Sequence, residues 1–274
     1  MHEDRAAVHV PARGATGSKE KPVLKSVVIH DIPINHIAAM ERWYYRDHAP
    51  EINRRFGPWL TRHDSYLPVD APPDARAAGF YNWRVTEGYW RELPEPGARG
   101  NLAFTVPPTE PRVAAGFFPA QPTEDFFGGQ LQPHERAVLR WFQLIRYPEG
   151  VGASEGEAWY LDVHARELGR LPGVYRAFST RAVQEAIRLP GEWPPHHRPT
   201  PGNLQSRWDR LTELWFENFD AWREFTAAAS TQCTRPSWAT ASGYPFVRPN
   251  TELVSSFLLE RPTDEFWRDA RGYL

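Results

Sequence analysis

The chain alternates short hydrophobic runs that suit β-strands with stretches that have helical spacing. Val23 to Asp31 is a β-branched run that ends before Pro33, which is typical of a buried strand. The residues after it share the three- and four-residue period of one helix face: Ile37, Met40, Tyr44 and His48. Pro50 lacks the N–H group that would continue this helix, so we expect it to end or kink near Ala49, with a short second helix through Arg55.

The same pattern predicts the order strand, helix, strand, strand, helix, strand in each half of the chain. The other strands of the first half are expected at Thr61 to Pro68, Phe80 to Val85 and Arg112 to Phe118. Thr86 is suited to a helix N-cap, and the second helix is expected to follow it. The strands of the second half are expected at Ala137 to Tyr147, Tyr175 to Ala182, Leu211 to Glu217 and Leu253 to Glu260. Its first helix is expected to start at a capping box of Ser154 and Glu157 and to run through His164, and its second helix at Phe219 to Ala228.

Three sequence blocks occur twice in the same order, which indicates a duplicated unit. Trp43 to Ala49 and Trp159 to Ala165 share the pattern W-Y-x-x-x-H-A, 116 residues apart. Trp83 and Trp90-Arg91-Glu92 reappear 132 residues later as Trp215 and Trp222-Arg223-Glu224. Pro122 to Phe126 resembles Pro262 to Phe266, 140 residues further on. An offset that only grows is expected from duplication followed by loop insertions.

These patterns predict an α+β fold of two fused ferredoxin-like β-α-β-β-α-β repeats. Each repeat leaves one sheet face apolar, so the two sheets are expected to pack face to face within one chain, as a barrel or sandwich. The expected boundaries are a disordered tail at residues 1–22, a first repeat at 23–132 and a second repeat at 133–274. Pairing of whole chains into a homodimer stays open.

Composition narrows the classes of partner. A formal net charge of -2 gives no long-range attraction to phosphate backbones or anionic lipids, so neither nucleic acid nor membrane is an expected partner. No apolar run is long enough to span a bilayer, and residues 1–22 have no signal-peptide pattern. The single cysteine, Cys233, suits a reducing compartment, so a cytoplasmic location is expected. The aromatic share of 14% suggests a pocket for a flat or apolar ligand.

Trp43, His48, Ala49 and Pro50 resemble the Trp, His-Ala-Pro signature of EthD-like proteins in the dimeric α+β barrel superfamily. The second half departs from that signature because Arg166 stands where the proline is expected, which suggests a degenerate or structural site there. The resemblance implies an intramolecular dimeric α+β barrel with a pocket between each sheet and its helices. It also implies cofactor-free isomerases, cyclases, lyases or monooxygenases acting on aromatic or polyketide-like molecules, and it includes heme-binding branches.

The candidate acid/base residues are His48, Tyr44, Asp64, Tyr66 and His63. His48 lies on the core-facing side of its helix, where an imidazole can act as acid or base or can simply bind a carbonyl that Pro50 leaves free. Alternate strand residues face opposite sides, so either His63 or the pair Asp64 and Tyr66 can face the pocket.

Seven further residues are candidates for the pocket wall: His30, Trp43, Trp83, Trp141, Tyr160, His164 and Trp215. The tryptophans can equally be plain core, and a structural role is favoured for His164. No metal site is expected, because His196 and His197 have no third ligand at a suitable spacing. The usual nucleotide-binding and serine-hydrolase motifs do not occur in the sequence.

These residues suggest an enzyme without metal or organic cofactor that moves protons in an elimination, isomerisation or cyclisation of a small aromatic or unsaturated molecule. In that hypothesis His48 is the acid or base, Tyr44 and Tyr66 donate hydrogen bonds to a developing oxyanion, and Asp64 is a second acid/base group. Two alternatives stay open. One is a heme- or flavin-using oxidoreductase on the same fold, and the other is a non-catalytic protein that binds an aromatic ligand.

Overall fold

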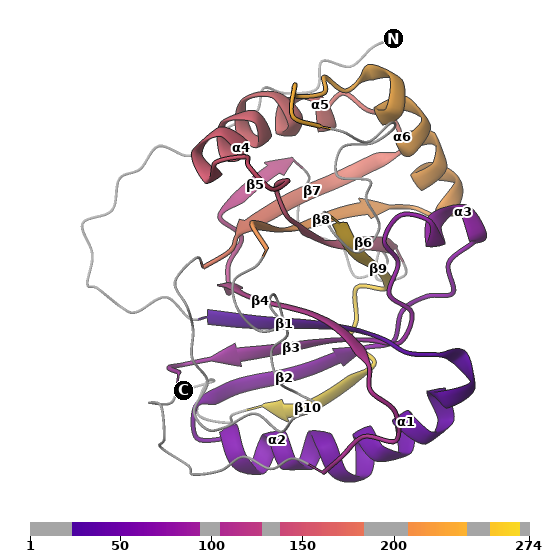
Figure 1. The fold of residues 1–274 in the computed structure, drawn as a ribbon, viewed down its shortest axis with the longest axis vertical. Helices are drawn as coiled ribbons and strands as arrows, with labels where there is room; N and C mark the ends of the chain where they lie inside the picture. The colour runs from indigo at the N-terminus through magenta and orange to yellow at the C-terminus, as the bar shows by residue number, and fades with distance from the viewer. Residues whose placement is uncertain (1–23, 94–104, 128–137, 184–207, 240–252, 269–274) are drawn as a thin grey trace.

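Two five-stranded antiparallel sheets face each other, and helices cover the outer face of each sheet (Figure 1). This computed structural model describes residues 24–93, 105–127, 138–183, 208–239 and 253–268. The expected tail at 1–22 and the pair His196-His197 lie outside the described residues. The α+β class and the sheet-to-sheet packing of two ferredoxin-like repeats within one chain, both expected from the sequence, are confirmed.

The first sheet has the strand order β10-β2-β3-β1-β4. Its strands from the first half are β1 (Leu24–Asp31), β2 (Leu60–Tyr66), β3 (Arg84–Trp90) and β4 (Arg112–Pro119). The outer face is covered by a short 3₁₀ turn η1 (Ile34–His36), α1 (Ile37–Trp43), a π-helical turn η2 (Tyr44–His48) and α2 (Ala49–Phe56). The kink expected near Ala49 is therefore a π-helical turn, in which the Ala49 N–H donates to the Tyr44 carbonyl.

The second sheet repeats this plan with the order β5-β7-β8-β6-β9. Its strands from the second half are β6 (Leu139–Ile145), β7 (Val174–Arg181), β8 (Arg210–Phe216) and β9 (Leu253–Leu258). Its outer face carries α4 (Ala153–Trp159), a second π-helical turn η4 (Tyr160–His164), α5 (Ala165–Leu168) and α6 (Phe219–Gln232). In each half, the third strand lies between the first two, which is the ferredoxin-like arrangement.

Each half also contributes an edge strand to the other half's sheet. β5 (Glu124–Phe127) pairs with β7, and β10 (Asp264–Arg268) pairs with β2. These two strands are the third repeated sequence block, and Asp264 and Glu124 occupy equivalent positions opposite Ser65 and Ser179. Both sheets are thus built from residues of both halves.

The β2–β3 connection of the first half, residues 67–83, reaches the open edge of the second sheet and is the crossing segment. Phe80 bridges Ser255 of β9, and the Gly79 carbonyl accepts from the Ser255 N–H at 2.8 Å. Gly79 has φ +71°, and a Cβ there would lie 2.4 Å from the Leu253 carbonyl oxygen, so only glycine fits this crossing. The short helix α3 (Pro73–Arg76) follows the same route, and its Ala75 packs in the core beneath the helices of the second sheet.

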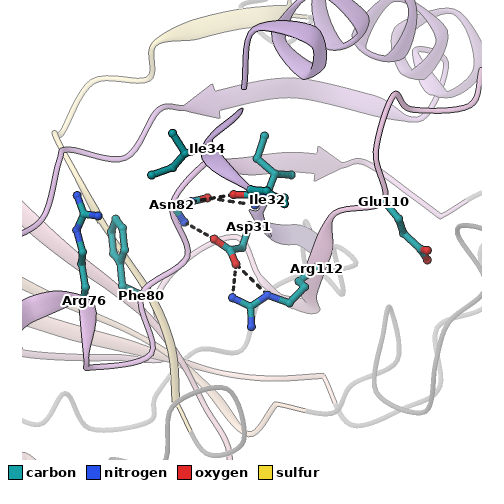
Figure 2. A pocket seen from close by; sticks show the side chains of 9 residues that line it. Asp31, Ile32, Ile34, Arg76, Phe80, Asn82, Glu110 and Arg112 are labelled. Carbon is teal, nitrogen blue, oxygen red and sulfur yellow. Dashed lines mark hydrogen bonds and ion pairs between the residues drawn. The ribbon is translucent and has the colours of Figure 1, made fainter. Parts of the chain in front are cut away.

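The far end of this connection is fixed to β1. The Asn82 side chain accepts from the Ile32 N–H at 3.1 Å and donates to the Ile32 carbonyl at 2.9 Å. Asp31 accepts from the Asn82 N–H and also pairs with Arg112 of β4 (Figure 2). These contacts hold the crossing segment against the end of the first sheet.

Inward-facing side chains of the two sheets form an apolar core that contains Val27, Ile29, Phe142, Leu144 and Leu211. The other end of the space between the sheets contains buried ion pairs, in which Lys25 contacts Glu87 at 3.1 Å and Arg140 contacts Glu213 at 3.4 Å. Among the described residues, no helix combines the length and apolarity needed to cross a bilayer.

Two local expectations are wrong. Thr86 does not cap a helix: it lies in the middle of β3, paired with Val28, and residues 105–111 before β4 contain no helix. Strand pairing with β1 and β2 overrides the capping preference of a lone threonine. The block at Trp90 ends β3 while its supposed partner at Trp222 lies in α6, so these two segments are not equivalent.

The expected capping box is also absent. Gly152 stands at the N-cap of α4, where no side chain caps the helix, and Glu157 binds Arg210 instead. By contrast, Asn218 does cap α6, accepting from the N–H groups of Asp220 and Ala221. A carboxylate gains more from a buried guanidinium than from a helix end, which explains why Glu157 turns inward.

Candidate functional site

The W-Y-x-x-x-H-A motif of the first half forms an aromatic cluster at η2, on the outer face of the first sheet. The ring of His48 stacks on Trp43 with centroids 4.6 Å apart and lies 5.3 Å from the ring of Tyr44. Trp43 donates through Nε1 to the Thr105 carbonyl at 3.0 Å. His48 is half-buried, with its Nδ1 covered, whereas Trp43 and Tyr44 are buried, so His48 is the most exposed of these three residues.

A fully buried arginine organises the floor of this site. Arg84 is 0% exposed and donates to Glu41 at 2.6 Å and to Ser65 Oγ at 2.6 Å, with Asp264 at 3.3 Å. Its guanidinium lies 4.2 Å from the ring centroid of Tyr44. Two carboxylates and an aromatic face therefore compensate the burial of this charge.

Tyr44 is held over this arginine by its hydroxyl, which lies 2.9 Å from Thr86 Oγ1. Burial raises the pKa of Tyr44, and the positive charge of Arg84 only partly opposes this. The phenol is therefore neutral at ordinary pH and keeps a proton that it can donate in a hydrogen bond.

His63 and His30 lie on the same outer face. His63 is buried and its Nδ1 is 2.8 Å from Asn53 Oδ1 of α2. Burial, assisted by the charge of Arg84, lowers the pKa of His63 to about 4. His30 meets the ring of Trp83 edge to face at 5.5 Å. Trp83 in turn meets the Tyr44 ring edge to face at 5.8 Å, and Phe266 lies 5.4 Å from the His63 ring and 5.6 Å from the Tyr44 ring.

Asp64 and Tyr66 face the opposite side, toward the second sheet. Asp64 is fully buried and pairs with Arg62, and Tyr66 donates to Glu87 at 3.2 Å. The guanidinium of Arg140 lies 4.7 Å from the Tyr66 ring. The structure therefore brings His63 together with His48 and Tyr44, and it separates Asp64 and Tyr66 from them.

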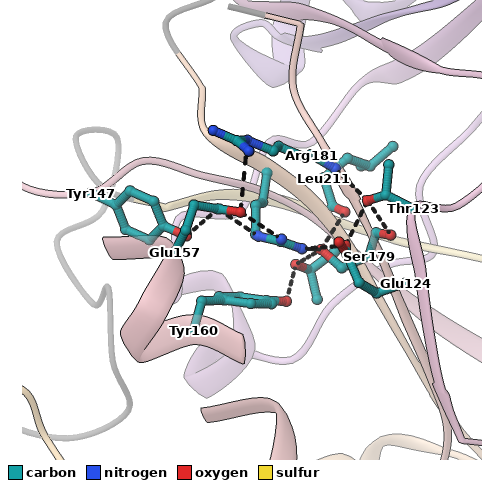
Figure 3. Close-up of polar contacts among 10 residues, drawn as sticks. Thr123, Glu124, Tyr147, Glu157, Tyr160, Ser179, Arg181 and Leu211 are labelled. Atoms are coloured by element: carbon teal, nitrogen blue, oxygen red, sulfur yellow. Dashed lines mark hydrogen bonds and ion pairs between the residues drawn. The ribbon is translucent and has the colours of Figure 1, made fainter. Parts of the chain in front are cut away.

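The second half repeats the arginine-centred floor (Figure 3). Arg210 donates to both oxygens of Glu157 at 2.8 Å and to Glu124 of β5 at 2.7 Å. Its guanidinium lies 4.3 Å from the ring centroid of Tyr160, whose hydroxyl lies 2.7 Å from Thr212 Oγ1. The set is equivalent, residue by residue, to that around Arg84.

His164 differs from His48 in its exposure. It is 0% exposed and its ring stacks on Trp159 at 5.0 Å. Burial, assisted by the charge of Arg210, lowers the pKa of His164 to about 3. This imidazole is neutral throughout the physiological range and has no surface that a substrate can approach directly.

The remaining two candidates of the second half lie apart from each other. Trp141 is on the outer face, where its ring meets Trp222 edge to face at 5.6 Å. Trp215 faces the space between the sheets, where the guanidinium of Arg140 lies 5.7 Å from its ring. Trp215 therefore shares no pocket with Trp141, Tyr160 and His164.

The two arginines were missed from the sequence, although a signal existed. Arg84-Val85-Thr86-Glu87 and Arg210-Leu211-Thr212-Glu213 share the pattern R-x-T-E, with an aliphatic second residue, 126 residues apart. In both copies the arginine and threonine bind the tyrosine of the W-Y-x-x-x-H-A motif. The glutamate of each copy points to the other face and contacts Lys25 or Arg140.

Three cavities lie around α3 and the crossing segment. One of about 730 Å³ is lined by Asp70, Arg76, Phe219 and Arg223 among others. A second, of about 580 Å³, includes Asp31, Phe80 and Arg112 (Figure 2). The third, of about 260 Å³, lies between α3, α6 and the second sheet. His48 and His164 line none of these three.

Residues 22–106 match the family model of the chalcone isomerase N-terminal domain. This segment contains His48, Tyr44, His63 and Arg84, but it covers less than half of the chain. No curated protein matches the chain.

Several solved structures are similar in outline. An anthrone oxidase-like protein is 12% identical, with a TM-score of 0.45, over 92% of this chain and 98% of its own. The chlorite dismutase from Candidatus Nitrospira defluvii in complex with imidazole is 10% identical, with a TM-score of 0.43, over 87% and 92%. A putative monooxygenase from Lactobacillus acidophilus NCFM is 10% identical, with a TM-score of 0.31, over 87% and 94%. Similarity at this level says nothing about the reaction of this chain.

Proposed function

We propose that this protein is a cofactor-independent enzyme that isomerises or cyclises a small phenolic, unsaturated molecule by acid/base catalysis at His48. The observation that carries the proposal is the half-buried imidazole of His48, stacked on Trp43 and flanked by the neutral phenol of Tyr44. A partly exposed imidazole in an aromatic wall can exchange protons with a flat substrate near neutral pH. The EthD-like signature supports the same residue.

The family match suggests the type of reaction. A chalcone is a diaryl α,β-unsaturated ketone, and one that carries a phenol beside the ketone can isomerise by closing a ring without any change in composition. The phenol loses its proton to a base, and the phenolate oxygen adds to the β-carbon while electrons move onto the ketone oxygen. The enolate then takes a proton at the α-carbon, and the oxygen loses its charge. This sequence needs one group that accepts a proton and returns it, together with a hydrogen-bond donor for the enolate oxygen.

In the proposal His48 accepts the phenol proton and returns it to the α-carbon, while the buried Tyr44, whose ring lies 5.3 Å from that of His48, positions the imidazole. Thr86 orients the Tyr44 hydroxyl, and Arg84 below the ring favours negative charge nearby. Tyr66 and Asp64 are left out of this mechanism because they face the other sheet. The proposal names the class of substrate, a phenolic enone, and not the substituents on its rings.

The test is the conversion of a panel of phenolic chalcones, followed by the loss of enone absorbance and by mass spectrometry. His48→Gln is expected to lower kcat/KM by about 100-fold or more, the size of a lost general acid/base group. His36→Gln is a matched control, because His36 lies in η1 outside the aromatic cluster, and it should leave turnover unchanged. Wild-type turnover in a folded His48→Gln protein would remove His48 from the mechanism.

The heme alternative is not favoured at the two most deeply buried histidines of the outer faces. His164 is 0% exposed and His63 is 2% exposed, so neither imidazole edge borders a space in which a heme could lie. Binding of chalcones without conversion would favour the third reading, a protein that only sequesters an aromatic ligand.

A further inference from the structure

The pocket of about 580 Å³ lies where the crossing segment meets the end of β1 and the start of β4. Figure 2 shows Arg112 and Asp31 on one side of this pocket and Arg76 and Phe80 on the other. A volume of this size is within the range of pockets that hold small molecules. His48 does not line it, so the pocket is separate from the site of the proposed reaction.

Asp31 holds the guanidinium of Arg112 in a fixed position at the pocket wall. Its Oδ2 accepts from Arg112 Nε at 2.9 Å and from Nη2, and its Oδ1 accepts from the Asn82 N–H at 3.2 Å. Asn82 is itself bound to the backbone of Ile32 through both atoms of its amide, and the ring centroid of Tyr81 lies 5.2 Å from the guanidinium. Arg112 Nη1 makes no hydrogen bond with a described residue, and the side chain is 60% exposed. The arginine therefore presents a positioned N–H edge that a ligand carboxylate can reach.

A carboxylate lies on the same side of the pocket as Arg112 (Figure 2). Glu110, two residues before Arg112, lines the pocket and is exposed. It makes no hydrogen bond or ion pair with any residue that the structure describes. One wall of the pocket thus offers a positive and a negative group that both have bonding capacity left. A ligand that carries both charges matches this wall.

The pocket also has an apolar part, to which Ile34 and Phe80 contribute. Ile34 is 69% exposed and Phe80 is half-buried, so an apolar group packed against them would remove apolar surface from water. Arg76, which lies beside Phe80 and pairs with Asp70, marks the far end (Figure 2). A cationic side chain would meet this guanidinium, whereas an apolar side chain would not be repelled.

We propose that this pocket binds a zwitterionic α-amino acid with an apolar side chain. The ligand carboxylate accepts from Arg112 Nη1, its ammonium group donates to Glu110, and its side chain lies against Ile34 and Phe80. Glu110 is the residue that favours a zwitterion over a simple carboxylate, because its charge opposes an anion that brings no ammonium group. The inference goes beyond the proposed reaction at His48 and does not depend on it.

Calorimetric titration with L-phenylalanine, 3-phenylpropionate and 2-phenylethylamine tests the proposal. The three probes share a phenyl group and carry both charges, only the negative charge and only the positive charge. The wild-type protein should bind phenylalanine about tenfold or more tightly than either of the other two. L-Lysine should bind more weakly than phenylalanine, because its cationic side chain would extend toward Arg76.

Two conservative variants assign the charges. Glu110→Gln should weaken phenylalanine binding by about tenfold and should not weaken 3-phenylpropionate binding. Arg112→Lys keeps a positive charge beside Asp31 but lacks the planar fork, so it should weaken both carboxylate probes by a similar factor and leave 2-phenylethylamine binding unchanged. The matched controls Glu155→Gln in α4 and Arg42→Lys in α1 alter exposed residues outside the pocket and should change no affinity.

Folding and catalysis are followed separately from binding. Both pocket variants should melt close to the wild-type temperature, because Glu110 and Arg112 are exposed side chains. His48→Gln should bind phenylalanine like the wild type, which keeps this test independent of the catalytic one. Absence of phenylalanine binding, equal wild-type affinity for phenylalanine and 3-phenylpropionate, or an unchanged phenylalanine affinity in Glu110→Gln would each overturn the proposal.

Discussion

Arg84 and Arg210 occupy equivalent positions on the outer faces of the two sheets, and each lies over the tyrosine of its W-Y-x-x-x-H-A motif. Each also binds a serine of the neighbouring strand and a glutamate of the first helix. Even the covering contacts repeat, since Trp43 donates to the Thr105 carbonyl and Trp159 to the Thr234 carbonyl. The elements that both copies keep are those that hold helix to sheet.

The copies differ at positions that this framework does not use. His30 and His63 line the first outer face, and strand register places Ile145 and Ala177 at the equivalent positions of the second. His48 is half-buried while His164 is fully buried. A shared framework with unlike linings indicates that the arginine network holds helix to sheet in both halves. The proposed site is distinguished by the greater exposure of His48 than of His164 and by the histidines beside it.

The exchanged edge strands make the two sites interdependent. Asp264 reaches Arg84 from the second half, and Glu124 reaches Arg210 from the first half. Each buried guanidinium is thus neutralised in part by a carboxylate from the other repeat. Neither repeat alone can complete its own ionic network, which explains why the two halves are expected to unfold together.

The largest expected effect is the loss of either buried arginine. Arg210→Met should lower the free energy of unfolding by about 3–5 kcal/mol, because it removes the buried guanidinium that pairs with Glu157 and Glu124. Arg84→Met should cost somewhat less, because Asp264 lies 3.3 Å from Arg84 while Glu124 lies 2.7 Å from Arg210. Urea denaturation measures both values. The exposed Arg42→Ala is the control, and similarly small losses for all three variants would contradict a structural network.

A second effect concerns acid pH. The folded pKa values of His164 and His63 are lowered to about 3 and about 4, while an unfolded histidine titrates near 6.5. The unfolded chain therefore binds more protons than the folded one below pH 6.5. Stability is fully present above that pH and is lost as the pH falls toward the folded values, by about 2 kcal/mol per histidine at pH 5.

Unfolding curves at pH 7 and pH 5 check this sign. The difference in unfolding free energy between the two pH values should shrink by about 2 kcal/mol in His164→Leu and by a similar amount in His63→Leu. The double variant His63→Leu/His164→Leu should remove both contributions. An unchanged difference in both single variants would show that these imidazoles are not buried as described.

The smallest expected effect concerns the side-chain hydrogen bonds of Asn53. Asn53 links α2 to His63 of β2 and, through Nδ2, to the Phe266 carbonyl of β10 at 2.9 Å. Its counterpart in the second half is Gly169, which has no side chain to make such a link. Asn53→Ala should therefore lower the free energy of unfolding by about 1 kcal/mol, measured by chemical denaturation. An unchanged free energy of unfolding would mean that this hydrogen bond does not stabilise the fold.

The sequence by itself determined the duplication, the class of fold and most strands, because these depend on local periodicity and on repeated blocks. The strand that ends at Asp31 and the kink before Pro50 are properties of residues close together in the chain. The aromatic motif around His48 was likewise visible, since its members lie within one helical segment.

Only the tertiary structure decided which face of β2 lies toward the candidate site. The alternation of His63, Asp64 and Tyr66 permits two orientations, and the choice depends on which side the helices cover and which the second sheet covers. The pairing of β5 and β10 with the sheet of the other half could not be predicted from the sequence for the same reason. The partner of a short edge strand depends on which sheet edge the rest of the fold leaves open. Arg84 and Arg210 look like surface charges in the sequence, and they become the centres of two sites only when carboxylates from both halves converge on them.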